Sequence, residues 1–173
     1  MIIVKKQVPG LSAAAMTRFV ARAQRAARLR RTVNVLVTSS RELKSLNRLF
    51  RGKNYPTDVL SFPAAGNLAN SIAGDVAISV EIAAKNARRL KHSTAEEVKI
   101  LMLHGVLHLA GYDHERDDGE MARKENRLRR SLGLPVGLIE RQIRHKTQTT
   151  LATGNTPKRK LVGKGARAAR TSR

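Results

Sequence analysis

The segment His104-Gly-Val-Leu-His108-Leu-Ala-Gly111-Tyr-Asp-His114 closes a long apolar stretch of the sequence. The stretch opens with Ser93-Thr-Ala-Glu96, which has the spacing of a capping box and predicts a helix over residues 94–110. The second half of this helix is apolar nearly all round, which is typical of a helix buried at the centre of a domain. We therefore expect the rest of the fold to pack around it.

Short β-branched runs and amphipathic stretches flank this helix. Strands are predicted at residues 2–4, 33–37, 59–62 and 76–80, and further helices at residues 12–31, 40–50, 81–91 and 118–132. Residues 51–58 and 64–73 are predicted to be loops. Because strands and helices alternate without a strict β-α-β repeat, the sequence predicts an α+β fold, with a small mixed sheet of about four strands packed with about five helices.

Length and composition exclude several classes of protein. At 173 residues the chain has the length of one domain with a tail. It lacks cysteine, so it has no disulfides, and a metal site must use histidine and carboxylate ligands. No apolar run is long enough to span a membrane, and the first residues do not form a secretory signal. We therefore expect a cytoplasmic protein.

The chain carries 34 Lys and Arg against 13 Asp and Glu, a formal charge of +21, which predicts a polyanionic partner. The charge is +12 over residues 1–57, +1 over 58–145 and +8 over 146–173. We expect a folded domain over residues 1–144 and a disordered basic tail over residues 145–173, which either contacts phosphates or is merely solvated.

Within the first helix, arginines lie opposite the apolar face. This basic stripe is either an ordinary solvated face or a set of RNA contacts, and it consists of Arg18, Arg22 and Arg25.

The three histidines of the opening segment predict a metal site on the central buried helix. His104 and His108 are four residues apart and project from one helix face. Gly111 can adopt a positive φ, which lets the chain turn and return His114 to the same point. Three imidazoles are the ligand set of a catalytic zinc ion, which keeps a fourth position open for water.

The same spacing occurs in the metzincin peptidases, in which a glutamate follows the first histidine as general base. Here that position is Gly105, which cannot transfer a proton, so a peptidase is the weaker interpretation. Asp113 lies beside the third histidine. It could orient a ligand, serve as a base or simply cap the turn.

The motif His-Gly-x-Leu-His-Leu-x-Gly-Tyr-Asp-His resembles the signature of the YbeY family of bacterial rRNA maturation factors. The stretch from Phe50 to Pro63 and the stretch Gly74-Asp-Val-Ala-Ile-Ser are similar to two further blocks of that family. The resemblance covers about residues 1–140. It implies a single-strand-specific, zinc-dependent endoribonuclease that acts in 16S rRNA 3′-end maturation and ribosome quality control.

The resemblance also implies the roles of individual residues. It implies one zinc ion per chain, held by His104, His108 and His114, with an rRNA precursor or the small ribosomal subunit as partner. It further implies that Arg51 acts near the metal, where a guanidinium can bind two phosphate oxygens. Without the resemblance, Arg51 could equally be a loop arginine that contacts backbone carbonyls.

Other contacts to RNA are suggested by residue type. Lys53 is a candidate second phosphate contact, and Tyr55 and Tyr112 are candidate stacking platforms for bases. The three phenylalanines are expected to lie in the core. A protein of a different class remains open, namely a non-catalytic rRNA-binding assembly factor with a structural zinc, for which a fourth ligand such as Asp113 or His92 would be required.

Overall fold

The computed structural model describes residues 1–66, 71–114 and 116–135. These residues form four strands, β1 (Ile2–Val4), β2 (Thr32–Thr38), β3 (Val59–Pro63) and β4 (Ile72–Ser79). They also form five helices, α1 (Ala13–Ala27), α2 (Ser40–Arg51), α3 (Val80–Leu90), α4 (Thr94–Leu109) and α5 (Glu120–Leu132). The predicted α+β fold with a four-stranded mixed sheet and five helices is confirmed.

The strands lie side by side in the order β1-β2-β4-β3. β1, β2 and β4 are parallel, whereas β3 runs antiparallel to β4 and forms one edge of the sheet. Ser61 of this edge strand pairs with Val76 of β4. Among the described strands, none lies beyond β3, so the outer side of β3 presents backbone groups without a strand partner.

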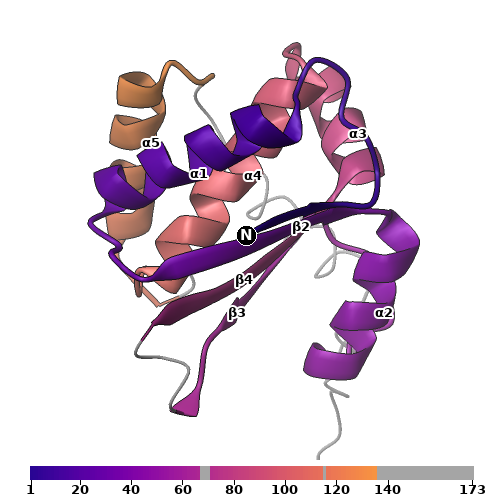
Figure 1. Cartoon of the computed structure of the whole chain (residues 1–173), viewed down its shortest axis with the longest axis horizontal. Helices are drawn as coiled ribbons and strands as arrows, with labels where there is room; N and C mark the ends of the chain where they lie inside the picture. The colour runs from indigo at the N-terminus through magenta and orange to yellow at the C-terminus, as the bar shows by residue number, and fades with distance from the viewer. Residues whose placement is uncertain (67–70, 115, 136–173) are drawn as a thin grey trace, which may run out of the picture. The chain divides into compact units, whose positions relative to one another are not determined.

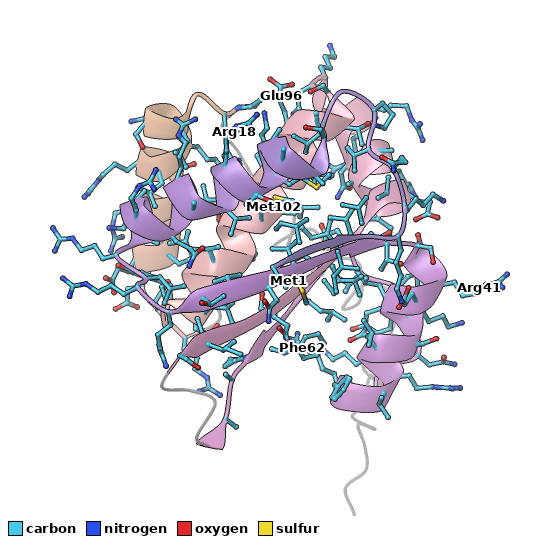
Figure 2. The ribbon with its side chains drawn as sticks, viewed as in Figure 1. Met1, Arg18, Arg41, Phe62, Glu96 and Met102 are labelled. Atoms are coloured by element: carbon cyan, nitrogen blue, oxygen red, sulfur yellow. The ribbon has the colours of Figure 1, made fainter. Side chains whose placement is uncertain are left out.

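The helices cover the two faces of the sheet unequally. In Figure 1, α2 lies on one face, and α1, α3, α4 and α5 lie on the other. α4 lies between the sheet and these helices, so most of its second half is fully buried, including Met102, which is labelled in Figure 2. A smaller core on the face that α2 covers is built from Leu43, Leu60 and Ala77.

Serine and glutamate caps explain where α4 begins. The side chain of Ser93 accepts a hydrogen bond from the backbone of Glu96, whose own carboxylate accepts one from the Ser93 backbone. This is the capping box that the sequence predicts, and it satisfies two backbone donors at the start of the helix.

Several predicted boundaries are wrong. α1 ends at Ala27 rather than near residue 31, because Arg28 adopts a left-handed conformation with φ of 59° and caps the helix. β4 begins at Ile72, inside a stretch predicted to be a loop, because residues 72–75 pair with β2. The predicted tail, residues 145–173, lies outside the described residues.

Candidate metal centre

Three imidazoles meet at the end of α4. His104 and His108 lie on this helix and His114 comes after it, and each offers a ring nitrogen within 4.8 Å of those of the other two. The ring centroids are 4.7 Å apart for His104 and His108, 5.4 Å for His104 and His114, and 5.1 Å for His108 and His114. The predicted convergence of the three side chains is therefore present, and the cluster could hold a metal ion.

The turn after α4 returns His114 to the cluster. α4 ends at Leu109, and Gly111 takes a φ of +94°, a conformation that other residues rarely adopt. The turn is fixed by hydrogen bonds from the Gly111 backbone to His108 O and from the Tyr112 backbone to Leu107 O.

The hydrogen bonding of the cluster suits a metal ligand set. Within the described part of the chain, neither buried ring nitrogen of His114 has a hydrogen-bond partner. The Nε2 atoms of His104 and His108 face each other at 3.1 Å. Buried imidazole nitrogens without partners are costly unless a ligand satisfies them, so these residues fit a metal ion.

Burial and charge keep His108 neutral, which a metal ligand requires. Burial lowers the pKa of His108 from its usual 6.5 to about 4, with a further contribution from the charges that His104 and His114 would carry. The charge of Asp113 opposes this shift only in part.

A buried carboxylate on α5 holds His104 in place. Glu125 Oε2 lies 2.9 Å from His104 Nδ1, and Glu125 is in turn paired with the buried Arg129. Burial alone would raise the pKa of Glu125, but the hydrogen bond with His104, the charge that His104 would carry if protonated and the charge of Arg129 hold it below 4.5. An ionised Glu125 accepts the Nδ1 proton, which leaves His104 Nε2 as the nitrogen directed at the cluster.

Sequence reasoning missed this carboxylate. Glu125 lies in a helix with many basic residues, and its Arg129 neighbour four positions later looks like an ordinary surface pair. Only the packing of α5 against α4 shows that both side chains are about 99% buried.

Gly105 is required by packing. A Cβ at this position would lie 2.6 Å from Val76 Cγ1 and 3.2 Å from Ser61 Oγ. α4 thus approaches the sheet so closely that the residue after the first histidine has no room for a side chain. A glutamate of the peptidase kind could not be accommodated here.

Arg51 lies at the end of α2, on the outer side of β3. Its guanidinium donates a hydrogen bond to Ser61 O at 3.3 Å, so the expected alternative of a contact to a backbone carbonyl is present. The same Ser61 packs against Gly105, the neighbour of His104. One residue of the edge strand therefore separates Arg51 from the turn of α4 that carries the histidines.

The other predicted contacts lie on nearby or separate surfaces. Lys53 and Tyr55 are exposed in the loop after α2, which Asn47 anchors through its side chain to Tyr55 O at 2.8 Å. Asp113 forms an ion pair with Arg116 at 3.5 Å. The structure thus brings together the three histidines. Asp113 lies next to His114, and its charge acts on His108. Among the described residues, no hydrogen bond or ion pair joins Lys53 or Tyr55 to the cluster.

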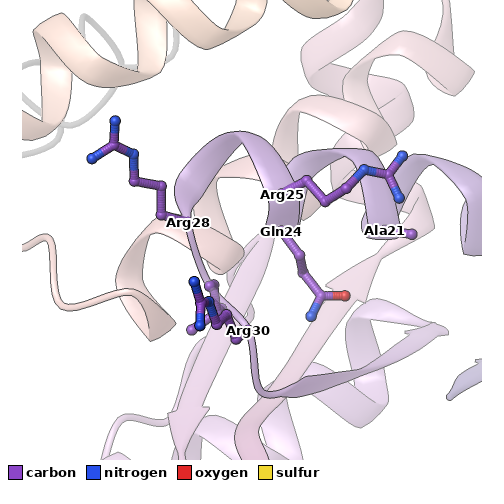
Figure 3. Close-up of a pocket in the computed structure, with 6 residues that line it drawn as sticks. Ala21, Gln24, Arg25, Arg28 and Arg30 are labelled. Carbon is purple, nitrogen blue, oxygen red and sulfur yellow. The ribbon is translucent and has the colours of Figure 1, made fainter.

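The basic stripe of α1 is exposed, as predicted for Arg18, Arg22 and Arg25. A cavity of about 710 Å³ lies where this helix ends, and its lining includes Arg25, Arg28 and Arg30 (Figure 3). In the close-up, the three guanidinium groups point in different directions. None of the three histidines lines this cavity.

Comparison with known proteins identifies the family. The family model described as Endoribonuclease YbeY matches residues 4–133. Endoribonuclease YbeY of Koribacter versatilis (strain Ellin345) is 56% identical over 141 residues, 82% of this chain and 91% of the relative. Endoribonuclease YbeY of Solibacter usitatus (strain Ellin6076) is 50% identical over 127 residues, 73% of this chain and 84% of the relative. The chain therefore belongs to the YbeY family.

A solved structure supports the fold. The solution structure of TM1509 from Thermotoga maritima has a TM-score of 0.55 and 26% sequence identity, and the match covers 92% of this chain and all of that one. In the ranges that the structure describes, no helix has both the length and the hydrophobicity that crossing a bilayer requires.

Proposed function

We propose that this protein is a single-strand-specific endoribonuclease with one zinc ion held by His104, His108 and His114. The observation that carries the proposal is the convergence of these three imidazoles in a member of the Endoribonuclease YbeY family. Three nitrogen ligands leave the open position that a catalytic zinc needs. The proposed substrate is a 16S rRNA precursor, cut during 3′-end maturation and ribosome quality control.

The chain's own residues have distinct roles in this proposal. When bound, the metal ion supplies Lewis-acid stabilisation of the charge that develops on the phosphate. Arg51 exchanges its hydrogen bond to Ser61 O for the phosphate oxygens, where a guanidinium can form two bonds at once. Lys53 adds a second cation on the approach to the site, and Asp113, next to His114, is the candidate base.

The competing class is a non-catalytic assembly factor with a structural zinc. Such a site generally has four protein ligands, and the cluster found in the described residues has three. His92, one candidate for the fourth, is 2.7 Å from Glu97 at the opposite end of α4. A peptidase of the metzincin kind would need a glutamate as general base after the first histidine. Gly105 occupies that position, and the packing leaves no room for a side chain there.

The test is cleavage of a 3′-extended rRNA precursor by wild type, His108→Ala and Arg51→Ala, each checked for folding. We expect wild type with zinc to cut single-stranded segments and both variants to lose most of the activity. Ile3→Ala, an exposed apolar substitution on the opposite edge of the sheet, is the matched control. If folded wild type with zinc leaves the precursor intact, the proposed nuclease activity is wrong. If Arg51→Ala cleaves normally, the proposed role of Arg51 at the phosphate is wrong.

A further inference from the structure

An exposed apolar patch lies at the end of α2. Leu49, Phe50 and Tyr55 are 74%, 62% and 54% exposed. The expectation that the phenylalanines lie in the core is wrong for Phe50, although Phe19 is buried. Exposing an aromatic ring to water forgoes the stabilisation that burial would give, so its position calls for a ligand that covers it.

The Phe50 ring has a fixed support. Its centroid is 5.1 Å from that of Phe62, with the two ring planes at 60°, a tilted arrangement that is favourable for aromatic pairs. Phe62 belongs to β3 and packs against the core of Leu43, Leu60 and Ala77 beneath α2 (Figure 2). Phe50 is therefore held on one side by the protein and open to solvent on the other.

The helix that carries this ring and the loop after it are cationic. The exposed basic residues of α2 and the adjoining loop are Arg41, Lys44, Arg48, Arg51 and Lys53. Glu42 is the acidic residue of α2, and it is paired with Lys5 at 2.6 Å. An open aromatic ring among cations is the combination by which proteins bind single-stranded nucleic acid, with bases on the ring and phosphates on the cations.

A chain of contacts links the residue next to this ring to the helix that carries the metal centre. Arg51, the next residue, donates to Ser61 O on the outer side of β3, and Ser61 Oγ faces Gly105 of α4. A strand whose phosphate lies at Arg51 would therefore carry a neighbouring base past Phe50. The metal centre and the ring lie on opposite faces of the edge strand, and the RNA would cross that edge.

We propose that Phe50 is a stacking platform for one base of the single-stranded RNA substrate. The proposal rests on the proposed endoribonuclease function and adds how the substrate is held. Stacking tolerates every base, because each base has an aromatic face. It also favours single strands, since a base inside a duplex is already stacked on its neighbours and cannot offer its face to Phe50.

The test measures binding by fluorescence anisotropy, using a 2′-O-methyl RNA single strand and a strand of equal length whose bases have been removed. Strand integrity is checked after each titration. Phe50→Ala is expected to weaken binding of the strand with bases by about tenfold to a hundredfold, the effect of losing one stacked base. Binding of the abasic strand should not change, because the phosphates and cations remain.

Further variants separate stacking from packing. Phe50→Trp should restore affinity for the strand with bases, whereas Phe50→Leu, which keeps apolar volume but not the aromatic face, should not. Ile3→Ala, which removes an exposed apolar side chain from the opposite edge, should bind like wild type.

Each other outcome overturns the proposal. If Phe50→Ala loses affinity equally for both strands, Phe50 has a structural role. If its affinity for both strands is unchanged, the exposed patch binds something other than a base, such as an apolar segment of a protein. If wild type binds neither strand, the proposed endoribonuclease function is wrong. If wild type binds and cuts RNA while Phe50→Ala binds equally well, the endoribonuclease function stands and the stacking role of Phe50 is wrong.

Discussion

Glu125 determines which nitrogen of His104 is available to a metal ion. Its carboxylate lies 2.9 Å from Nδ1, so the proton of the neutral ring is held there and Nε2 keeps its lone pair. Removal of the carboxylate frees the ring to rotate and to exchange its proton between the two nitrogens. Because both partners are buried, loss of this contact should also lower the stability of the protein.

We predict that Glu125→Gln weakens zinc binding by about 10- to 100-fold, the usual result of losing a carboxylate behind a ligating histidine. Glu125→Ala should also lower the free energy of unfolding of the metal-free protein by about 3–5 kcal/mol, because the buried Arg129 loses its carboxylate partner. Zinc affinity is measured by competition with a chelating dye, and stability by urea unfolding. Glu120→Gln, on an exposed position of the same helix, is the control, and wild-type zinc affinity in Glu125→Gln would contradict the account.

At the scale of single residues, the sequence predicts contacts that depend on spacing along the chain and misses contacts that depend on packing between elements. The histidine cluster was predictable, because a four-residue interval and a glycine turn bring side chains together through local geometry. The roles of Glu125 and Phe50 were not, because they depend on how α5 meets α4 and on how α2 lies at the edge of the sheet. The cationic surroundings of Phe50 were visible in the sequence, but its exposure was not.

At the scale of elements, the approach of α4 to the sheet places the metal centre. Gly105 allows this approach, since a Cβ there would overlap the branched side chain of Val76. The sequence indicated the central helix through its apolar composition and its capping box. It did not indicate the left-handed Arg28 that ends α1 early, because an arginine rarely takes that conformation.

We predict that Gly105→Ala lowers the free energy of unfolding by about 1–3 kcal/mol, as overpacking of a filled core does. Val76→Ala makes space at the same contact, so the double variant should cost less than the sum of the two single variants. Unfolding in urea measures all three. If the losses in free energy of unfolding add fully in the double variant, or if Gly105→Ala is as stable as wild type, α4 does not contact the sheet at Gly105.

At the scale of the whole molecule, positive charge lies mainly outside the segment that carries the histidines. Residues 1–57 carry +12 and residues 146–173 carry +8, whereas the segment between them carries +1. The proposed division of labour is that the basic regions attract RNA and the nearly neutral segment cuts it. Such long-range attraction depends on salt, because bound RNA releases its counterions.

We predict that deletion of residues 146–173 weakens binding to single-stranded RNA and makes it less dependent on salt, while the rate of cleavage at saturating RNA changes little. The expected change in the slope of log affinity against log salt is up to about 0.7 for each basic residue in contact with a phosphate. Titrations at several salt concentrations measure it. An unchanged slope would mean that the tail does not touch RNA.

The metal content of the purified protein, measured by mass spectrometry after zinc loading and dialysis, tests the central claim most directly. The three-histidine site predicts about one zinc ion per chain in wild type and far less in folded His108→Ala and His114→Ala. Wild type without bound metal, or a His108→Ala variant that retains a full equivalent, would contradict the assignment of these histidines as the metal centre.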